Sequence, residues 1–64
     1  MPNRVQYYRR KIGLSQSELA RLVDVSRNTI SSIERCEYIP TLKTAFKLAK
    51  VLNVDINVLF KYID

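Results

Sequence analysis

The side chains best suited to chemistry are concentrated in residues 25–35, which read VSRNTISSIER. Arginine presents a planar fork of N–H donors, asparagine both donates and accepts hydrogen bonds, and a serine hydroxyl can do either. The run has no histidine, no cysteine and only one acidic residue, so it offers neither a metal site nor a general base paired with an acid. Its chemistry is recognition through hydrogen bonds.

The rest of the chain offers little to a catalytic site. It contains no histidine, one glycine, one cysteine and six acidic residues that show no paired-carboxylate spacing. Ser31 and Ser32 have no candidate for an activating base other than lysine, and a structural zinc needs four ligands that this composition does not supply. A single cysteine also excludes a disulfide within the chain. We therefore predict that the protein is not an enzyme and uses no metal or cofactor.

Helical geometry separates the polar side chains of this run from its apolar ones. At 100° per residue, Ile30 and Ile33 fall on the same side as Ser26, which is expected to cap the helix. The opposite side carries five residues that we call the polar face: Arg27, Asn28, Ser31, Ser32 and Arg35. An ordinary solvated helix surface mixes acids with bases, whereas the polar face has no acid.

The polar face has the residue types that recognise base edges. Arginine can donate two hydrogen bonds to guanine and asparagine can pair with adenine, while the small serines let a helix approach a groove closely. The alternative is a solvated helix surface that simply lacks acids. The pattern favours base recognition, and the positive charge of the chain points the same way.

Hydrophobic periodicity and capping signals predict five helices around one core. The expected helices cover about residues 3–12, 16–23, 26–35, 42–52 and a last short one after the cap Asp55. Ser15 and Glu18 form a capping box, and Gly13 and Asn53 suit helix ends. The apolar positions expected in the core include Val5, Tyr8, Ile12, Leu19, Val23, Leu42, Ala45, Phe46, Leu48, Ala49, Leu52, Ile56, Leu59 and Phe60. The prediction is one all-α domain, a compact five-helix bundle over residues 1–64.

The charge balance favours a polyanionic partner. Eleven lysines and arginines face six acids, for a net charge of +5 and a pI near 9.7. No apolar run approaches the ~20 residues of a membrane span, and the basic N-terminus is not followed by the apolar segment of a signal peptide. We expect a cytoplasmic protein that uses no membrane.

The run GLSQSELARLVDVSRNTISSIERCEYIPTLKTAFKLAKVLNVDINVLF resembles the Cro/C1-type (Xre family) helix-turn-helix domain of phage and bacterial repressors. The resemblance rests on LSQ-x-ELA, VS-x-x-TIS-x-IE, the Pro-Thr-Leu start of the fourth helix and L-x-V-x-x-x-x-LF. It implies a lambda-repressor-like fold and a double-stranded DNA partner. It further implies a dimeric repressor that reads a pseudo-palindromic operator with its third helix in the major groove. Asp24 departs from the family pattern, which usually has glycine in this turn.

The resemblance also implies roles for individual residues. Those matching base-reading positions are Arg27, Asn28, Ser32 and, at the margin, Ser31. Those expected at backbone phosphates are Gln16, Ser26, Thr29, Arg35, Thr41 and Lys43. Arg9 and Glu34 match a buried structural ion pair. Surplus apolar residues near the C-terminus are expected at a homodimer interface: Ile56, Val58, Tyr62 and Ile63. Folding of Tyr62 and Ile63 back onto the monomer core is the alternative.

Two other functions remain open from the sequence. A protein-interaction module, such as the antitoxin of a toxin–antitoxin pair, can use the same fold but usually carries an additional segment to cover the toxin. A binder of anionic membranes would need an amphipathic helix free of core duty, whereas the fourth helix is committed to the core. Preference for specific over random DNA would separate the first hypothesis from both.

Overall fold

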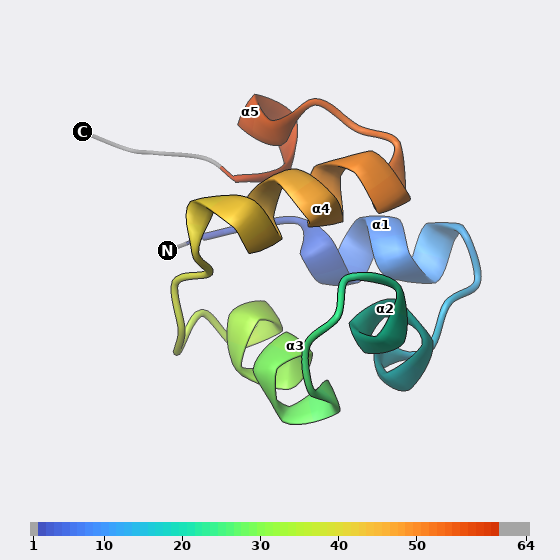
Figure 1. Ribbon diagram of the computed structural model, residues 1–64. Coiled ribbons are helices and arrows are strands. Elements are labelled where there is room, and N and C mark those ends of the chain that lie inside the picture. The colour runs from blue at the N-terminus through green and yellow to red at the C-terminus, as the bar shows by residue number, and fades with distance from the viewer. Residues whose placement is uncertain (1, 61–64) are drawn as a thin grey trace.

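The computed structural model describes residues 2–60 of the chain. These residues form five helices: α1 Val5–Lys11, α2 Gln16–Leu22, α3 Arg27–Glu34, α4 Leu42–Leu52 and α5 Ile56–Leu59. Helices α2 and α3 pack against each other on one side of the molecule, α1 and α4 form its middle, and α5 covers the far side of α4 (Figure 1). The prediction of an all-α, five-helix bundle is confirmed for these residues.

Polar side chains begin four of the five helices. Ser15 accepts a hydrogen bond from the backbone N–H of Glu18, whose carboxylate in turn accepts one from the N–H of Ser15, so the predicted capping box is present. The side chains of Ser26, Thr41 and Asp55 accept hydrogen bonds from first-turn N–H groups of α3, α4 and α5. These caps satisfy N–H groups that have no partner within the helix.

The capping box makes the stability of α2 depend on pH. Hydrogen bonds from Ser15, first from its backbone N–H and second from its side chain, lower the pKa of Glu18 from its ordinary value of 4.5. Because this pKa is lower in the folded state, the stabilisation is fully present above the ordinary pKa and is lost as the pH falls through the lowered one. We expect wild type to melt above Glu18→Gln at neutral pH and the difference to vanish in acid, as thermal melts followed by circular dichroism would show. A difference that stays constant with pH would contradict this expectation.

Four segments between helices use the left-handed backbone region. Gly13, Asp24, Cys36 and Asn53 have φ angles of 80°, 61°, 62° and 56°. Asparagine and aspartate tolerate this conformation better than most residues, so Asn53 ends α4 as expected and Asp24 can replace the glycine that the family usually has in its turn. Cysteine lacks this tolerance, so the backbone at Cys36, after α3, carries a small strain that a glycine would not have.

Three residues expected in the core are exposed, and two others, Tyr8 and Ile56, are only partly buried against it. Its buried apolar residues are Val5, Leu19, Ala20, Val23, Ile30, Ile33, Ala45, Leu48, Ala49, Leu52, Leu59 and Phe60. Leu42 and Phe46 were expected among them but are 70% and 56% exposed. On α4 the neighbouring helices bury only Ala45, Leu48, Ala49 and Leu52. The apolar side of α4 is therefore wider than the part of it that other elements cover. Ile12 is also exposed because α1 has ended at Lys11.

The two ends of the described chain meet. Asn3 and Phe60 form an isolated antiparallel β-bridge, and the N–H of Arg4 donates to the carbonyl of Leu59 at 2.9 Å. The sequence predicted a helix from about Asn3, with Asn3 as a plausible N-cap, whereas α1 begins at Val5 and Asn3 is paired with Phe60. The side chain of Asn3 still serves α1 by accepting a hydrogen bond from the N–H of Val5 at 3.1 Å.

Candidate nucleic-acid interface

Helix α3 presents the polar face away from the core. Ile30 and Ile33 are fully buried, whereas Arg27 and Asn28 at the start of the helix are exposed and Ser31 and Ser32 are half-buried. Ser26 caps α3, so the exposed first residues of this amphipathic helix lie directly after the cap. The structure therefore brings the four residues expected to read bases onto one accessible surface.

Five of the six residues expected at phosphates lie at the starts of α2, α3 and α4, whereas Arg35 follows the end of α3. Ser26 and Thr29 lie together at the start of α3, with their hydroxyl oxygens 2.9 Å apart. At the start of α4, the hydroxyl of Thr41 is 3.2 Å from that of Thr44, and Lys43 is exposed. Helix N-termini carry partial positive charge and free N–H groups, which suit anionic phosphate oxygens.

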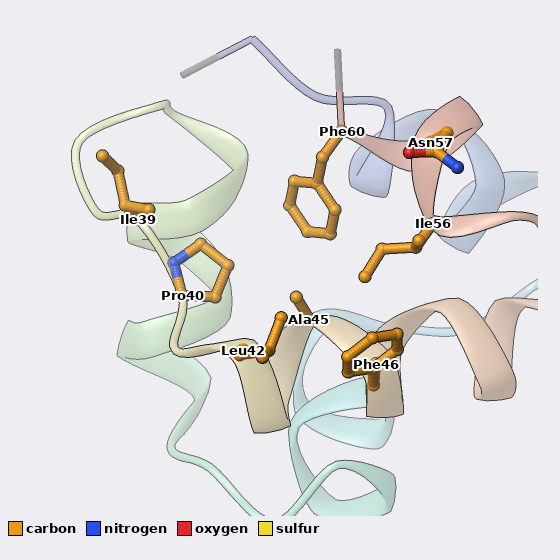
Figure 2. Close-up of a pocket in the computed structure, with 8 residues that line it drawn as sticks. All are labelled: Ile39, Pro40, Leu42, Ala45, Phe46, Ile56, Asn57 and Phe60. Carbon is orange, nitrogen blue, oxygen red and sulfur yellow. The ribbon is translucent and has the colours of Figure 1, made fainter. Parts of the chain in front are cut away.

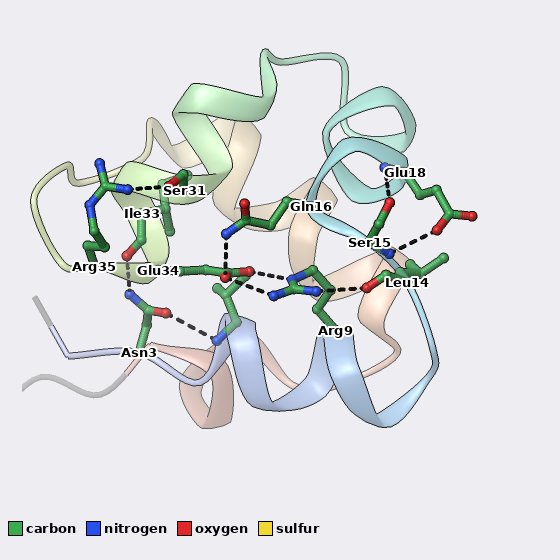
Figure 3. Close-up of polar contacts among 11 residues, drawn as sticks. Asn3, Arg9, Leu14, Ser15, Gln16, Glu18, Ser31, Ile33, Glu34 and Arg35 are labelled. Atoms are coloured by element: carbon green, nitrogen blue, oxygen red, sulfur yellow. Dashed lines mark hydrogen bonds and ion pairs between the residues drawn. The ribbon is translucent and has the colours of Figure 1, made fainter.

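A buried carboxylate joins α1, α2 and α3. Glu34, at the end of α3, accepts hydrogen bonds from Arg9 Nε at 2.6 Å and Arg9 Nη2 at 3.1 Å (Figure 3). Their side chains are only 2% and 8% exposed, respectively. Arg9 Nη1 also donates to the carbonyl of Leu14, just before α2, at 2.8 Å. The two residues that the family resemblance pairs thus lock α1 to both helices of the α2–α3 unit.

Gln16 is a further member of this cluster. Its Nε2 donates to Glu34 Oε1 at 3.1 Å, and a carboxylate can only accept, so the amide must turn its nitrogen inward. An amide nitrogen has two N–H groups, and the second remains for a partner outside. Sequence reasoning placed Gln16 at a phosphate but missed its bond to Glu34, since no local pattern reveals which helices approach in space.

Asn3 provides another contact that the sequence did not indicate. Its Nδ2 donates to the carbonyl of Ile33 at 2.8 Å, near the end of α3 (Figure 3). Carbonyls in the last turn of a helix lack partners within the helix. The segment before α1 therefore satisfies part of the C-terminal turn of α3, and both ends of this helix are held in place.

An apolar hollow lies on the side of α4 near α5. It has a volume of about 400 Å³ and is lined by Ile39, Pro40, Leu42, Ala45, Phe46, Ile56, Asn57 and Phe60 (Figure 2). Of the residues expected at a dimer interface, Ile56 lines it, whereas Val58 is exposed on α5 outside the lining. Tyr62 and Ile63 lie outside the described residues.

Metal-type clusters and membrane-spanning helices are both absent from the described part of the chain. Between residues 2 and 60 no group of three or more histidine, cysteine or acidic residues is placed to hold a metal ion. In the same range no helix is long and apolar enough to span a bilayer.

Comparison with known proteins gives the family. A family model described as helix-turn-helix matches residues 5–59, and the elements it covers are the five helices described above. The chain belongs to the helix-turn-helix family. This family is a class of DNA-binding transcriptional regulators, so the chain is a regulator of this class and not an enzyme.

Individual relatives agree with this assignment. An uncharacterised helix-turn-helix transcriptional regulator of Methanocaldococcus jannaschii is 47% identical over 64 residues, which cover the whole chain and 97% of the relative. The crystal structure of the P22 c2 repressor with a synthetic operator is similar with a TM-score of 0.87 and 33% identity, covering 91% of this chain and 88% of that one. The biofilm regulator SinR in complex with DNA gives a TM-score of 0.76 and 36% identity over 84% and 87% of the two chains.

Proposed function

We propose that the chain is a cytoplasmic, dimeric repressor that reads a pseudo-palindromic DNA operator with α3 in the major groove. The observation that carries this proposal is the polar face: an accessible, acid-free surface with Arg27 and Asn28 at the exposed start of a rigidly held helix. Similarity to a phage repressor and to SinR, both solved with DNA, supports it. The net charge of +5 supplies long-range attraction to the duplex.

Base recognition and phosphate contact divide between different residues in this proposal. Arg27, Asn28, Ser31 and Ser32 face base edges, where hydrogen bonds distinguish one base pair from another. Gln16, Ser26, Thr29, Arg35, Thr41 and Lys43 contact the backbone, which fixes register but carries no sequence information. The cluster around Glu34 fixes Gln16 relative to α3, so that phosphate contact and base contact are held in one rigid arrangement.

Dimer formation is assigned to the surface around the apolar hollow. Ile39, Leu42 and Phe46 are 62%, 70% and 56% exposed, and contiguous exposed apolar groups of this kind mark interaction surfaces. Ile56 lines the same hollow, and Val58 extends the apolar surface on α5. A two-fold dimer would place two α3 helices about 34 Å apart, one turn of the DNA helix, which suits half-sites about 10 bp apart.

The division of roles predicts different effects of substitution on specificity. Selection of bound sites from a random duplex library should first yield a pseudo-palindromic operator. On that site Arg27→Ala and Asn28→Ala should each cost about 1–3 kcal/mol of binding free energy and relax one base position. Gln16→Ala, the matched control, should weaken binding to selected and random duplexes by similar factors. Unchanged selection by Arg27→Ala would show that α3 is oriented differently.

A further inference from the structure

A second hollow, which we call the α3 hollow, borders the polar face. It has a volume of about 360 Å³ and is lined by Asn28, Thr29, Ser32, Glu37 and Tyr38. Asn28 and Ser32 belong to the polar face, whereas Glu37 and Tyr38 come from the segment between α3 and α4. A duplex whose major groove reaches Asn28 and Ser32 therefore also meets the mouth of this hollow.

Tyr38 supplies the largest apolar group of this lining. It is 45% exposed, and its neighbours in the lining carry an amide, a carboxylate and two hydroxyls. Thr29 is the one of these neighbours whose side chain also ends in a methyl group. The α3 hollow thus has an apolar part within a surface that is otherwise polar.

The chemistry of the lining decides which group of a duplex fits the α3 hollow. A phosphate oxygen does not fit, because the carboxylate of Glu37 repels it. Guanine presents only acceptors in the major groove, and a carboxylate disfavours these as well. Thymine presents its C5-methyl, which is the apolar group of the major groove and which aromatic side chains contact favourably.

Asn28 favours thymine over cytosine as the base at the α3 hollow. A cytosine amino group could donate to a carboxylate, but Glu37 Oε1 already accepts a hydrogen bond from Arg35 Nε at 3.1 Å. The amide of Asn28 lines the same hollow and is suited to pair with adenine, whose partner in the duplex is thymine. An A·T pair therefore matches both the amide and the ring.

We propose that Tyr38 is a specificity-determining residue, whose ring contacts the C5-methyl of a thymine in each operator half-site, in or next to the A·T pair that Asn28 reads. The inference rests on the function proposed above and deepens it. The methyl is present only on thymine, whereas phosphates are present in every sequence. Loss of this contact therefore lowers the ratio of operator binding to random binding.

The test removes the methyl from the DNA and leaves the protein unchanged. Each thymine of the selected half-site is replaced in turn by uracil, which keeps the hydrogen-bonding groups of thymine but lacks the C5-methyl. One replacement should weaken wild-type binding by about fourfold per half-site, as expected for the loss of one buried methyl-sized group. The same replacement should change the affinity of Tyr38→Ala by less than about twofold, because the two changes remove the same contact.

Tyr38→Ala should also separate operator binding from random binding. On the thymine-containing operator it should weaken binding by about fourfold or more per half-site. Its binding to a random duplex should stay within about twofold of wild type, because no phosphate contact is lost.

Two further variants serve as controls. Tyr38→Phe keeps the ring and removes the hydroxyl, so it should discriminate thymine from uracil as wild type does. Tyr7→Ala removes a tyrosine of α1 that is 59% exposed and lies outside the α3 hollow, and it should leave operator affinity and the discrimination unchanged. Circular dichroism melts check that each variant is folded, and the uracil series with wild type needs no variant.

Three results would overturn the proposal. The first is a selected half-site without thymine, or a uracil series that leaves wild-type affinity unchanged at every position. The second is a loss on uracil that persists at full size in Tyr38→Ala. The third is equal weakening of operator and random binding by Tyr38→Ala, which would indicate a contact with the DNA backbone. Failure of the proposed function itself looks different, because wild type would then bind the selected and the random duplex equally.

Discussion

Arg9→Ala is expected to destabilise the domain by about 3–5 kcal/mol, because it leaves the carboxylate of Glu34 buried without its charged partner. Glu34 is 2% exposed and would keep only the amide of Gln16 as a donor. A chain of this size has a total free energy of unfolding of about 3–10 kcal/mol. Much of the variant should therefore be unfolded at room temperature, as urea titration followed by circular dichroism would show.

The matched control replaces both charges at once. Arg9→Met with Glu34→Leu removes the desolvated pair and fills its volume with apolar atoms, and such replacements are often neutral or stabilising. We expect the double variant to recover most of the stability lost in Arg9→Ala. If Arg9→Ala costs less than about 1 kcal/mol, the pair behaves like an ordinary surface pair, and the proposed role of Glu34 in fixing α1 to α2 and α3 is wrong.

Phe46→Lys is expected to give a folded monomer whose operator affinity falls by about a hundredfold or more. The side chain is 56% exposed and lines the apolar hollow, so a lysine is tolerated in the monomer but places a charge where a second copy would pack. Loss of the second half-site removes the gain from linking two binding events, which is typically 10²–10⁴-fold. Sedimentation velocity and titration of the operator measure the two effects.

Two other substitutions locate the interface. Leu22→Lys changes a large apolar side chain of α2 that is similarly exposed but lies outside the hollow, and it should leave the sedimentation coefficient unchanged. Val58→Lys tests whether the interface extends across α5 beyond the lining of the hollow. A wild-type chain that is monomeric at micromolar concentration and binds DNA singly would contradict the dimer.

The sequence was most informative where structure depends on neighbours along the chain. The bounds of α4 follow from the cap Thr41 and from Asn53, whose short side chain tolerates the left-handed turn. The capping box of Ser15 and Glu18 acts over one helical turn and was visible for the same reason. The polar face followed from helical periodicity applied to α3 and to Arg35, which comes directly after it.

The sequence was least informative where distant elements meet. Leu42 and Phe46 have the periodicity of core residues, but whether an apolar arc is covered depends on how far α5 reaches across α4, and α5 has only four residues. The bond of Gln16 to Glu34 and the bond of Asn3 to Ile33 depend on helices approaching in space. For the ion pair of Arg9 and Glu34, family resemblance supplied what local patterns do not contain.

The bridge between Asn3 and Phe60 has a consequence for how the domain folds. It closes a loop of almost the entire chain, so its contacts have the largest sequence separation and a high closure entropy. Such contacts form late, after the local contacts between neighbouring helices. Asn3 also donates a hydrogen bond to the end of α3. The helix proposed to bind DNA is therefore held in its final position only when this late contact forms. Truncation or fusion at either end therefore acts on the whole domain, and the α2–α3 pair has little stability as an isolated fragment.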